Sequence, residues 1–195
     1  METHRRRVHR LDTRVIRVVP VAPSRLWDSA LPALGRAADH GALWFAVAAA
    51  LGLSGKRRAR RAALRGLAAQ GVASASANLI GKSLVRRARP TADQTPIIRR
   101  LRRPPTSSSF PSGHTASAAA FATGVALEHP RLALPVAALA AGVGVSRVVT
   151  GVHYPSDVVA GAAIGAAAGL ATTRWWPTLA PAPADAPDTV RALPA

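Results

Sequence analysis

The chain has 195 residues, which is enough for one domain with a sizeable core, and it contains no cysteine, which excludes disulfides and thiolate metal sites. Lysine and arginine number 26 against 9 aspartate and glutamate, giving a net charge of +17, yet 49% of the residues are hydrophobic. A chain that is both basic and hydrophobic is typical of a membrane protein with charged flanks. Only 4% of the residues are aromatic, so base-stacking rings are scarce and we expect no nucleic-acid partner.

The N-terminal part, residues 1–38, is expected to be a basic arm followed by an interfacial helix. Residues 1–17 are rich in arginine and are expected either to lie on anionic headgroups or to be disordered. Residues 18–38 mix Trp27 and several leucines with charged side chains, a pattern typical of an amphipathic helix in the membrane interface. Charges and a proline interrupt residues 11–21, so we expect no cleavable signal peptide.

A predicted membrane domain, residues 39–176, holds five apolar segments rich in alanine, glycine, leucine and valine: 41–53, 62–81, 115–127, 132–145 and 158–173. A helix needs about 20 apolar residues to cross a bilayer, so several of these segments are short. We expect an all-α fold, an integral membrane bundle of about five to six helices that crosses the cell membrane several times. A soluble, alanine-rich helical bundle is the alternative. Residues 177–195 are rich in proline and alanine and are expected to be disordered.

Small residues recur on one face of the last apolar segment. Gly161, Gly165 and Gly169 are four positions apart, so they lie on the same side of a helix. We expect this face to pack closely against a neighbouring helix.

Three motifs stand at the ends of the apolar segments: KSLVRRARP at residues 82–90, PSGH at 111–114 and SRVVTGVHYPSD at 146–157. Two antiparallel helices joined by a short turn return to the same side of the bundle. The three motifs are therefore expected to meet, which predicts an active site at one membrane face.

The motifs supply what a bound phosphate needs. A phosphate monoester carries close to two negative charges near neutral pH, and Lys82, Arg89 and Arg147 are candidate cations for its oxygens. Ser112 and Gly113 stand at the start of a helix, where free backbone N–H groups bind anions. The remaining arginines of the long loop are interpreted as flank charges or lipid-headgroup contacts: Arg86, Arg87, Arg99, Arg100, Arg102 and Arg103.

Two histidines are candidates for the chemistry. His153 is the predicted nucleophile, because a neutral imidazole can attack phosphorus, and Asp157, four residues later, can hold its other ring nitrogen. His114 is the predicted acid and base. Each of these features alone is more often structural, and a metal site is the rival reading. We expect no metal and no cofactor, because extra carboxylates and thiols are missing nearby and three cations would repel a metal ion.

Together these residues closely resemble the signature of the type 2 phosphatidic acid phosphatase superfamily. Its pattern is Lys, six residues, Arg-Pro; then Pro-Ser-Gly-His; then Ser-Arg, five residues, His, three residues, Asp, and this chain matches every position. The resemblance implies metal-free phosphohistidine chemistry on lipid phosphates or prenyl diphosphates, and inhibition by vanadate. The composition is also similar to that of small actinobacterial members, some suggested to process decaprenylphosphoryl phosphoribose. Soluble acid phosphatases of the superfamily usually carry a secretory signal and its haloperoxidases are far longer, so both are disfavoured.

The resulting hypothesis is a membrane phosphatase that hydrolyses a phosphate ester or anhydride of a lipid carrier, with the lipid phosphate and the bilayer as its partners. The alternative is a catalytically silent lipid-binding or scaffold protein with the same anion cradle. Charge counting favours a cytoplasmic site, whereas many bacterial members of the superfamily work on the outer face, and both remain open. The identity of the lipid and the oligomeric state are also open.

Overall fold

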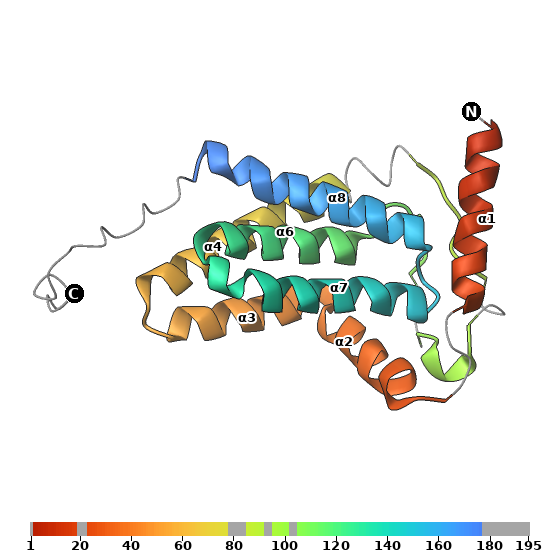
Figure 1. Cartoon of the computed structure of the whole chain (residues 1–195), viewed down its shortest axis with the longest axis horizontal. Coiled ribbons are helices and arrows are strands. Elements are labelled where there is room, and N and C mark those ends of the chain that lie inside the picture. Colours follow the sequence, from red (N-terminus) through yellow and green to blue (C-terminus); the bar gives the residue numbers. More distant parts are fainter. Residues whose placement is uncertain (1, 19–22, 78–84, 92–94, 102–104, 177–195) are drawn as a thin grey trace, which may run out of the picture.

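The computed structural model describes residues 2–18, 23–77, 85–91, 95–101 and 105–176 (Figure 1). These residues form helices and loops, and none of them forms a strand, so the all-α prediction is confirmed for the part described. The α-helices are α1 (Glu2–Val18), α2 (Leu31–Ala37), α3 (Ala42–Leu53), α4 (Arg57–Ala75), α6 (Gly113–Glu128), α7 (Ala133–Val149) and α8 (Pro155–Ala171). The short helical turns are η1 (Leu26–Ala30), η2 (Asp39–Gly41), η5 (Ile97–Arg99), η6 (Pro130–Leu132) and η7 (Thr172–Arg174).

Helix α6 is the centre of the bundle, because it packs against α4, α7 and α8. Figure 1 shows these helices lying along one another; α3 packs on α4, and α2 packs on α7. Two rings, Trp44 of α3 and Phe121 of α6, pack at 5.1 Å between their centroids, and both side chains are fully buried. Much of the remaining core is alanine, so the helices approach closely and each contact surface is small.

The predicted close-packed glycine face is confirmed at the contact of α8 with α6. A Cβ on Gly161 or Gly165 would collide with the main-chain carbonyls of Ser112 and Ala116. A Cβ on Gly169 would lie 2.6 Å from the Thr123 side chain, so all three positions require glycine as they are packed.

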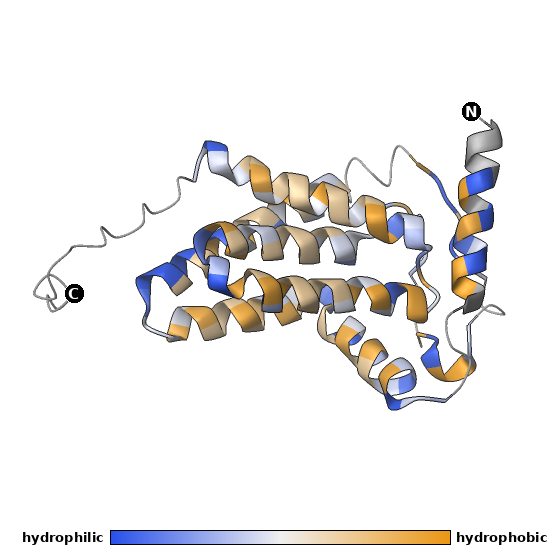
Figure 2. Cartoon of the chain, viewed as in Figure 1, coloured by the Kyte–Doolittle hydropathy of each residue, from blue (hydrophilic) through white to orange (hydrophobic). Residues whose placement is uncertain are grey.

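Each of the five predicted apolar segments lies largely within a helix, from α3 to α8. Among the residues that the structure describes, two helical stretches are long and apolar enough to cross a membrane, Pro130–Val149 and Pro155–Arg174, and a shorter apolar one covers Asp39–Leu53. Figure 2 shows the charged residues gathered toward the ends of the bundle, with the apolar ones between them.

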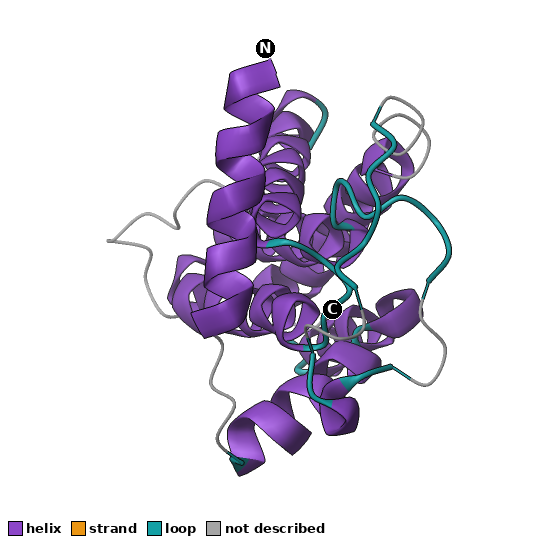
Figure 3. Cartoon of the chain, turned by 90° about the vertical axis from the view of Figure 1, so that its right-hand side faces the viewer, coloured by secondary structure: helices purple, strands orange, loops and turns teal. Residues whose placement is uncertain are grey.

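The N-terminal arm is not a free basic tail in the structure. Its residues Glu2–Val18 form α1, which stands across one end of the bundle and contacts α8 (Figure 3). Its Asp12 side chain is only 3% exposed, so this helix is anchored by a buried acid among its basic residues. The next expected helix, at 18–38, is realised as η1 and α2, and α2 packs on α7. The tail at 177–195 lies outside the described residues.

A buried ion pair joins three helices at the end of the bundle away from α1. Glu128 accepts hydrogen bonds from Arg61 at 3.2 Å and from Arg65 at 3.1 Å. The Arg65 Nε–H also donates to Thr172 Oγ1 at 2.9 Å, and both Arg65 and Glu128 have fully buried side chains. This network ties the start of α4 to the C-terminal ends of α6 and α8.

Candidate active site

A cavity of about 300 Å³ opens where the start of α6, the end of α4 and the α7–α8 loop meet. Five of the predicted site residues line it, and several polar residues that the motifs do not contain line it with them. The lining residues are Ala38, His40, Gly41, Gln70, Ser74, Arg89, Pro105, Ser107, Gly113, His114, Ser117, Arg147, Val152 and His153. The three motifs, as far as the structure describes them, therefore meet as predicted from their spacing.

His153 stands in the tight loop between α7 and α8 and is 4% exposed. Gly151, with a φ of 67°, makes the turn after α7, and Pro155 begins α8. His153 Nδ1 lies 3.7 Å from Asp157 Oδ2, an ion-pair separation too long for a direct hydrogen bond. Burial lowers the pKa of His153 and the Asp157 carboxylate opposes this, so the ring is neutral at neutral pH, as an attacking imidazole must be.

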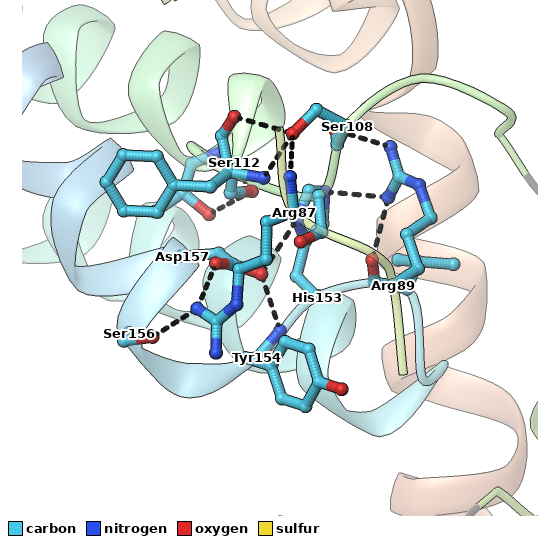
Figure 4. Close-up of polar contacts among 12 residues, drawn as sticks. Arg87, Arg89, Ser108, Ser112, His153, Tyr154, Ser156 and Asp157 are labelled. Atoms are coloured by element: carbon cyan, nitrogen blue, oxygen red, sulfur yellow. Dashed lines mark hydrogen bonds and ion pairs between the residues drawn. The ribbon is translucent and has the colours of Figure 1, made fainter. Parts of the chain in front are cut away.

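Asp157 is held from two sides, which fixes its carboxylate beside His153. Its Oδ2 accepts from the main-chain N–H of Tyr154 at 2.9 Å, and its Oδ1 accepts from Arg87 at 2.7 Å. Arg87 also lies over the Tyr154 ring at 4.2 Å and donates to the Ser156 hydroxyl at 2.7 Å (Figure 4). The interpretation of Arg87 as a flank charge was wrong, because its guanidinium is part of the support of the site.

The second partner of Arg87 comes from the first helix. Arg87 Nη2 donates to Asp12 Oδ2 at 2.6 Å, so one guanidinium bridges two carboxylates. Arg99, also expected to be a flank charge, is 2% exposed and donates to Asp28 Oδ1 at 2.6 Å, which corrects that expectation as well.

Arg89 is a fixed cation beside the predicted nucleophile. Its guanidinium donates to three main-chain carbonyls, those of Val152 at 2.7 Å, Ser107 at 3.0 Å and Ser108 at 3.2 Å. Its Nη1 lies 3.4 Å from His153 Nε2 (Figure 4). Burial lowers the pKa of Arg89, but the guanidinium remains protonated at neutral pH because its ordinary pKa is so high. A phosphate oxygen bound next to His153 would therefore lie beside a fixed positive charge.

Arg147 is the second fixed cation, on the last turn of α7, and it is 2% exposed. Its Nη1 lies 3.6 Å from Asp39 Oδ1, and its Nη2 has no hydrogen-bond partner among the described residues. The Nη2 atom faces Gly35 of α2 so closely that a Cβ there would collide with it. Arg147 is also one of the residues that line the cavity, so its charge lies beside any anion bound there.

Ser112 and Gly113 differ in where they face. Ser112 is fully buried and caps α6: its hydroxyl lies 2.9 Å from the Thr115 hydroxyl and accepts weakly from the Thr115 N–H. Its own N–H donates to the Asp157 carbonyl at 3.0 Å. Gly113 lines the cavity and Ser112 does not. The structure thus offers the backbone at Gly113 to a ligand and gives the Ser112 hydroxyl a structural partner.

His114 lies at the polar start of α6, ahead of its apolar run, and its Nε2 is 2.8 Å from Asp39 Oδ1. Burial, helped by the nearby Arg147 charge, lowers its pKa to about 4, although Asp39 acts in the opposite direction. A dianion bound between the two histidines would raise this pKa, because a nearby negative charge favours the protonated imidazole.

One predicted ligand, Lys82, lies outside the described residues. Three residues of the site belong to no motif and escaped sequence reasoning. Gln70 lines the cavity, Asp39 bonds to His114, and Asp12 bonds to Arg87. Among the described residues, no group of three or more histidine or acidic side chains is arranged to hold a metal ion.

Comparison with known proteins agrees with this geometry. A lipid A 1-phosphatase from Rhizobium johnstonii is 50% identical over 58 residues, which are 30% of this chain and 24% of that protein. The chain thus matches about a quarter of that relative's length. A decaprenylphosphoryl-5-phosphoribose phosphatase from Mycobacterium tuberculosis is 43% identical over 133 residues, 67% of this chain and 70% of that protein.

Two solved structures share the fold. The crystal structure of Aquifex aeolicus LpxE superposes with a TM-score of 0.62 at 25% identity, over 83% of this chain and 94% of that one. A PAP2-type phosphatidylglycerolphosphate phosphatase from Bacillus subtilis superposes with a TM-score of 0.63 at 23% identity, over 86% of this chain and 85% of that one. The model of the PAP2 superfamily matches residues 62–181, well over half the chain. With its three motifs meeting at one cavity, the chain belongs to the PAP2 superfamily, as the motif resemblance predicted.

Proposed function

We propose that this protein is a membrane phosphatase that removes a phosphate from a lipid carrier through a phosphohistidine. One observation carries the proposal: His153, His114, Arg89 and Arg147 line a single cavity. The curated relatives with matching sequences are phosphatases of lipid A and of decaprenylphosphoryl-5-phosphoribose, which makes lipid phosphates of the monoester and diphosphate type the first substrates to test.

In the first step, His153 Nε2 attacks phosphorus. The N–P bond forms as the P–O bond to the lipid alcohol breaks, and the leaving oxygen takes a proton from His114. Arg89 and Arg147 hold the phosphoryl oxygens, where the charge of the transition state is spread. Asp157 lies on the Nδ1 side and stabilises the positive charge that develops on the ring.

In the second step, His114, now neutral, takes a proton from water as the water oxygen attacks the phosphohistidine. The O–P bond forms, the N–P bond breaks, and the electron pair returns to His153. Inorganic phosphate then leaves, and both histidines are again in their starting protonation states.

We place the protein in the cell membrane as a multi-pass bundle of five to six helices, with the cavity at one membrane face. Two apolar stretches of spanning length support this, as does the presence of both predicted histidines at one end of the bundle. Because the chain has no cysteine, single-cysteine labelling tests it directly. Thr106→Cys and Ser54→Cys stand at exposed sites at the cavity end and at the end of α3, so an impermeant maleimide applied to intact cells should label one of them alone.

Phosphate release by detergent-purified protein tests the activity. The panel should contain phosphatidate, phosphatidylglycerophosphate, a polyprenyl diphosphate, a polyprenyl phosphoribose phosphate and lipid A. We expect release that survives EDTA, stops with vanadate and is lost in His153→Ala. His129→Ala, a histidine at the far end of α6, is the matched control and should retain activity.

The alternative is a silent binding or scaffold protein with the same cradle. Folded protein that binds lipid phosphates but releases no phosphate from any of them would favour that alternative and contradict the phosphatase.

A further inference from the structure

Helix α1 presents a mixed basic and apolar surface. Its sequence holds six arginines and two acids, and three of the arginines, Arg7, Arg10 and Arg14, are exposed. Leu11 and Val15 are exposed as well, at 56% and 48%. Neighbouring members of this set are three or four positions apart, so the two apolar side chains form a stripe with guanidinium groups beside it. Figure 2 shows the basic and apolar residues alternating along α1.

The bundle covers a different side of α1. Among its described side chains, Asp12 and Ile16 are buried, at 3% and 5% exposure, and the helix contacts α8. Most of the stability of a short amphipathic helix comes from what its faces pack against. The apolar stripe and its arginines are therefore open to a second partner, one that is both apolar and negatively charged.

The position of α1 identifies this partner as the bilayer. The helix lies across the end of the bundle where a loop joins the two stretches of spanning length, Pro130–Val149 and Pro155–Arg174 (Figure 1). Both stretches line an apolar groove of about 640 Å³, and Val15 and Trp27 line it with them. With the stretches across a membrane, α1 lies at the depth of the headgroups, where its stripe faces hydrocarbon and its arginines reach phosphates.

We propose that α1 docks on the anionic headgroups of the surrounding bilayer and that this docking holds the active site in its working arrangement, so that activity rises with the anionic lipid content of the membrane. The partner is a lipid surface and is distinct from the substrate. The inference rests on the proposed membrane phosphatase and adds a regulatory surface to it.

One buried side chain connects this surface with the chemistry. Asp12 stands on the inner side of α1 and accepts hydrogen bonds from Ser156 and Arg87. Arg87 in turn donates to Asp157, the carboxylate beside His153. A surface that binds the docked helix favours this chain of contacts over arrangements in which α1 has moved away.

The arginines set the size of the effect. Each arginine close to an anionic surface favours docking by about fivefold. In detergent alone no such surface is present, and the exposed arginines of α1 should then have no effect on kcat.

Fluorescence quenching tests the docking without any need for activity. The chain has no cysteine, so Leu11→Cys in the full-length protein takes a single fluorescent label on the stripe. The protein is placed in vesicles of phosphatidylcholine, or of phosphatidylcholine mixed with phosphatidylglycerol, with part of the lipid brominated on its acyl chains. We expect stronger quenching in the anionic vesicles, and this gain should shrink at high salt because exposed charges are screened.

Two sets of substitutions test the charge requirement. The α1 variant replaces the exposed arginines of that helix: Arg7→Gln, Arg10→Gln and Arg14→Gln. The matched α4 variant removes the same charge at the other end of the bundle, at three exposed positions: Arg57→Gln, Arg58→Gln and Arg60→Gln. The gain in quenching should be lost in the α1 variant and kept in the α4 variant.

Phosphate release in vesicles of the same two compositions tests the regulation. The substrate is one lipid phosphate that the wild type hydrolyses, at the same surface fraction in every vesicle. From neutral to anionic vesicles, kcat should rise by at least about fivefold in the wild type and in the α4 variant, and should stay level in the α1 variant. A direct effect of the surface on the substrate would change all three proteins alike.

Asp12→Asn separates the docking from its consequence. The label on Leu11→Cys should still be quenched more strongly in anionic vesicles, while the rise in kcat is lost. A rise that persists in Asp12→Asn would contradict the route through Arg87.

The outcomes distinguish the regulation from the phosphatase itself. Equal quenching in both kinds of vesicle, or a gain that the α1 variant keeps, would overturn the docking. Equal kcat of the wild type in both, with release abolished by His153→Ala, would overturn the regulation and leave the phosphatase standing. No release from any lipid would overturn the phosphatase proposal, and the quenching would still decide whether α1 docks.

Discussion

The main-chain N–H of Ser156 donates a hydrogen bond of 2.9 Å to Asp12, a residue 144 positions earlier in the chain. The Ser156 hydroxyl donates to the other carboxylate oxygen at 2.7 Å, so the first helix is bonded to the first turn of the last one. Asp12 also accepts from Arg87, which donates to Asp157. The carboxylate on α1 therefore stands one guanidinium away from the carboxylate beside His153.

Asp12 is predicted to be a positioning residue for the reaction. In Asp12→Asn the charge that holds Arg87 is lost, Asp157 shifts, and kcat should fall by about 10-fold to 100-fold, the usual cost of a small misplacement near the reacting atoms. Asp12→Glu should recover part of this loss. The measurement is kcat and KM on one lipid phosphate, with thermal unfolding in parallel.

Arg14→Gln is the matched control, because Arg14 is exposed on the same helix. It removes a charge from α1 without touching Arg87. An Asp12→Asn protein that melts earlier but keeps its kcat at low temperature would show that α1 serves stability alone.

Local pattern was enough to predict the helices and the pairing of His153 with Asp157. Pro155 at the start of α8 and a four-residue spacing bring His153 and Asp157 together whatever the rest of the fold does. The glycine face of α8 is likewise a matter of helical period. Such features depend on neighbours in the sequence, and these neighbours are visible in a single chain.

The supports of the site could not be predicted, because they are contacts between distant segments. Arg86 and Arg87 are adjacent and identical in type, yet Arg86 is exposed and Arg87 bridges two buried acids. Asp39 meets His114 across 75 positions, in a turn that no motif marks. Nothing in the local sequence separates these residues from ordinary surface charges.

Gly35 is predicted to be required for the placement of Arg147. A Cβ at Gly35 would collide with the Arg147 guanidinium, so Gly35→Ala should displace this cation from the cavity. We expect kcat/KM to fall by at least about tenfold, through weaker stabilisation of the phosphoryl charge. Phosphate release and the binding of vanadate measure this.

Gly52→Ala is the control for that change, because a Cβ at Gly52 meets nothing within 4 Å. Since alanine is the better helix former, this variant should be as active as the wild type and more stable by about 0.5–1 kcal/mol. Equal activity of the Gly35→Ala and Gly52→Ala proteins would mean that Arg147 does not contact the substrate.

The titration of His153 gives a prediction in pH. Burial, helped by the Arg89 charge, holds its pKa below the ordinary value of 6.5, whereas the Asp157 carboxylate and a main-chain contact of Ser109 raise it. The neutral ring, which is the attacking form, therefore persists as the pH falls through 6.5. In Asp157→Asn the charge that contributes most to raising the pKa is gone, so the midpoint should move further down while kcat drops. Nitrogen NMR of the ring in substrate-free protein measures both midpoints, and a wild-type value at or above 6.5 would contradict the buried, neutral nucleophile.

The ion pair at the far end of the bundle should matter for stability and leave the chemistry intact. Glu128→Gln leaves the buried Arg65 charge without its carboxylate, and breaking a buried pair in this way typically costs about 3–5 kcal/mol. Thermal unfolding in detergent should show the loss, while kcat measured well below the transition should stay close to that of the wild type, because neither residue lines the cavity.

Arg58→Gln is the control, because it removes an exposed charge of α4 and should change neither the stability nor kcat. A Glu128→Gln protein with unchanged stability would mean that water reaches Arg65, whereas a folded variant with reduced kcat would mean that the two ends of α6 are coupled.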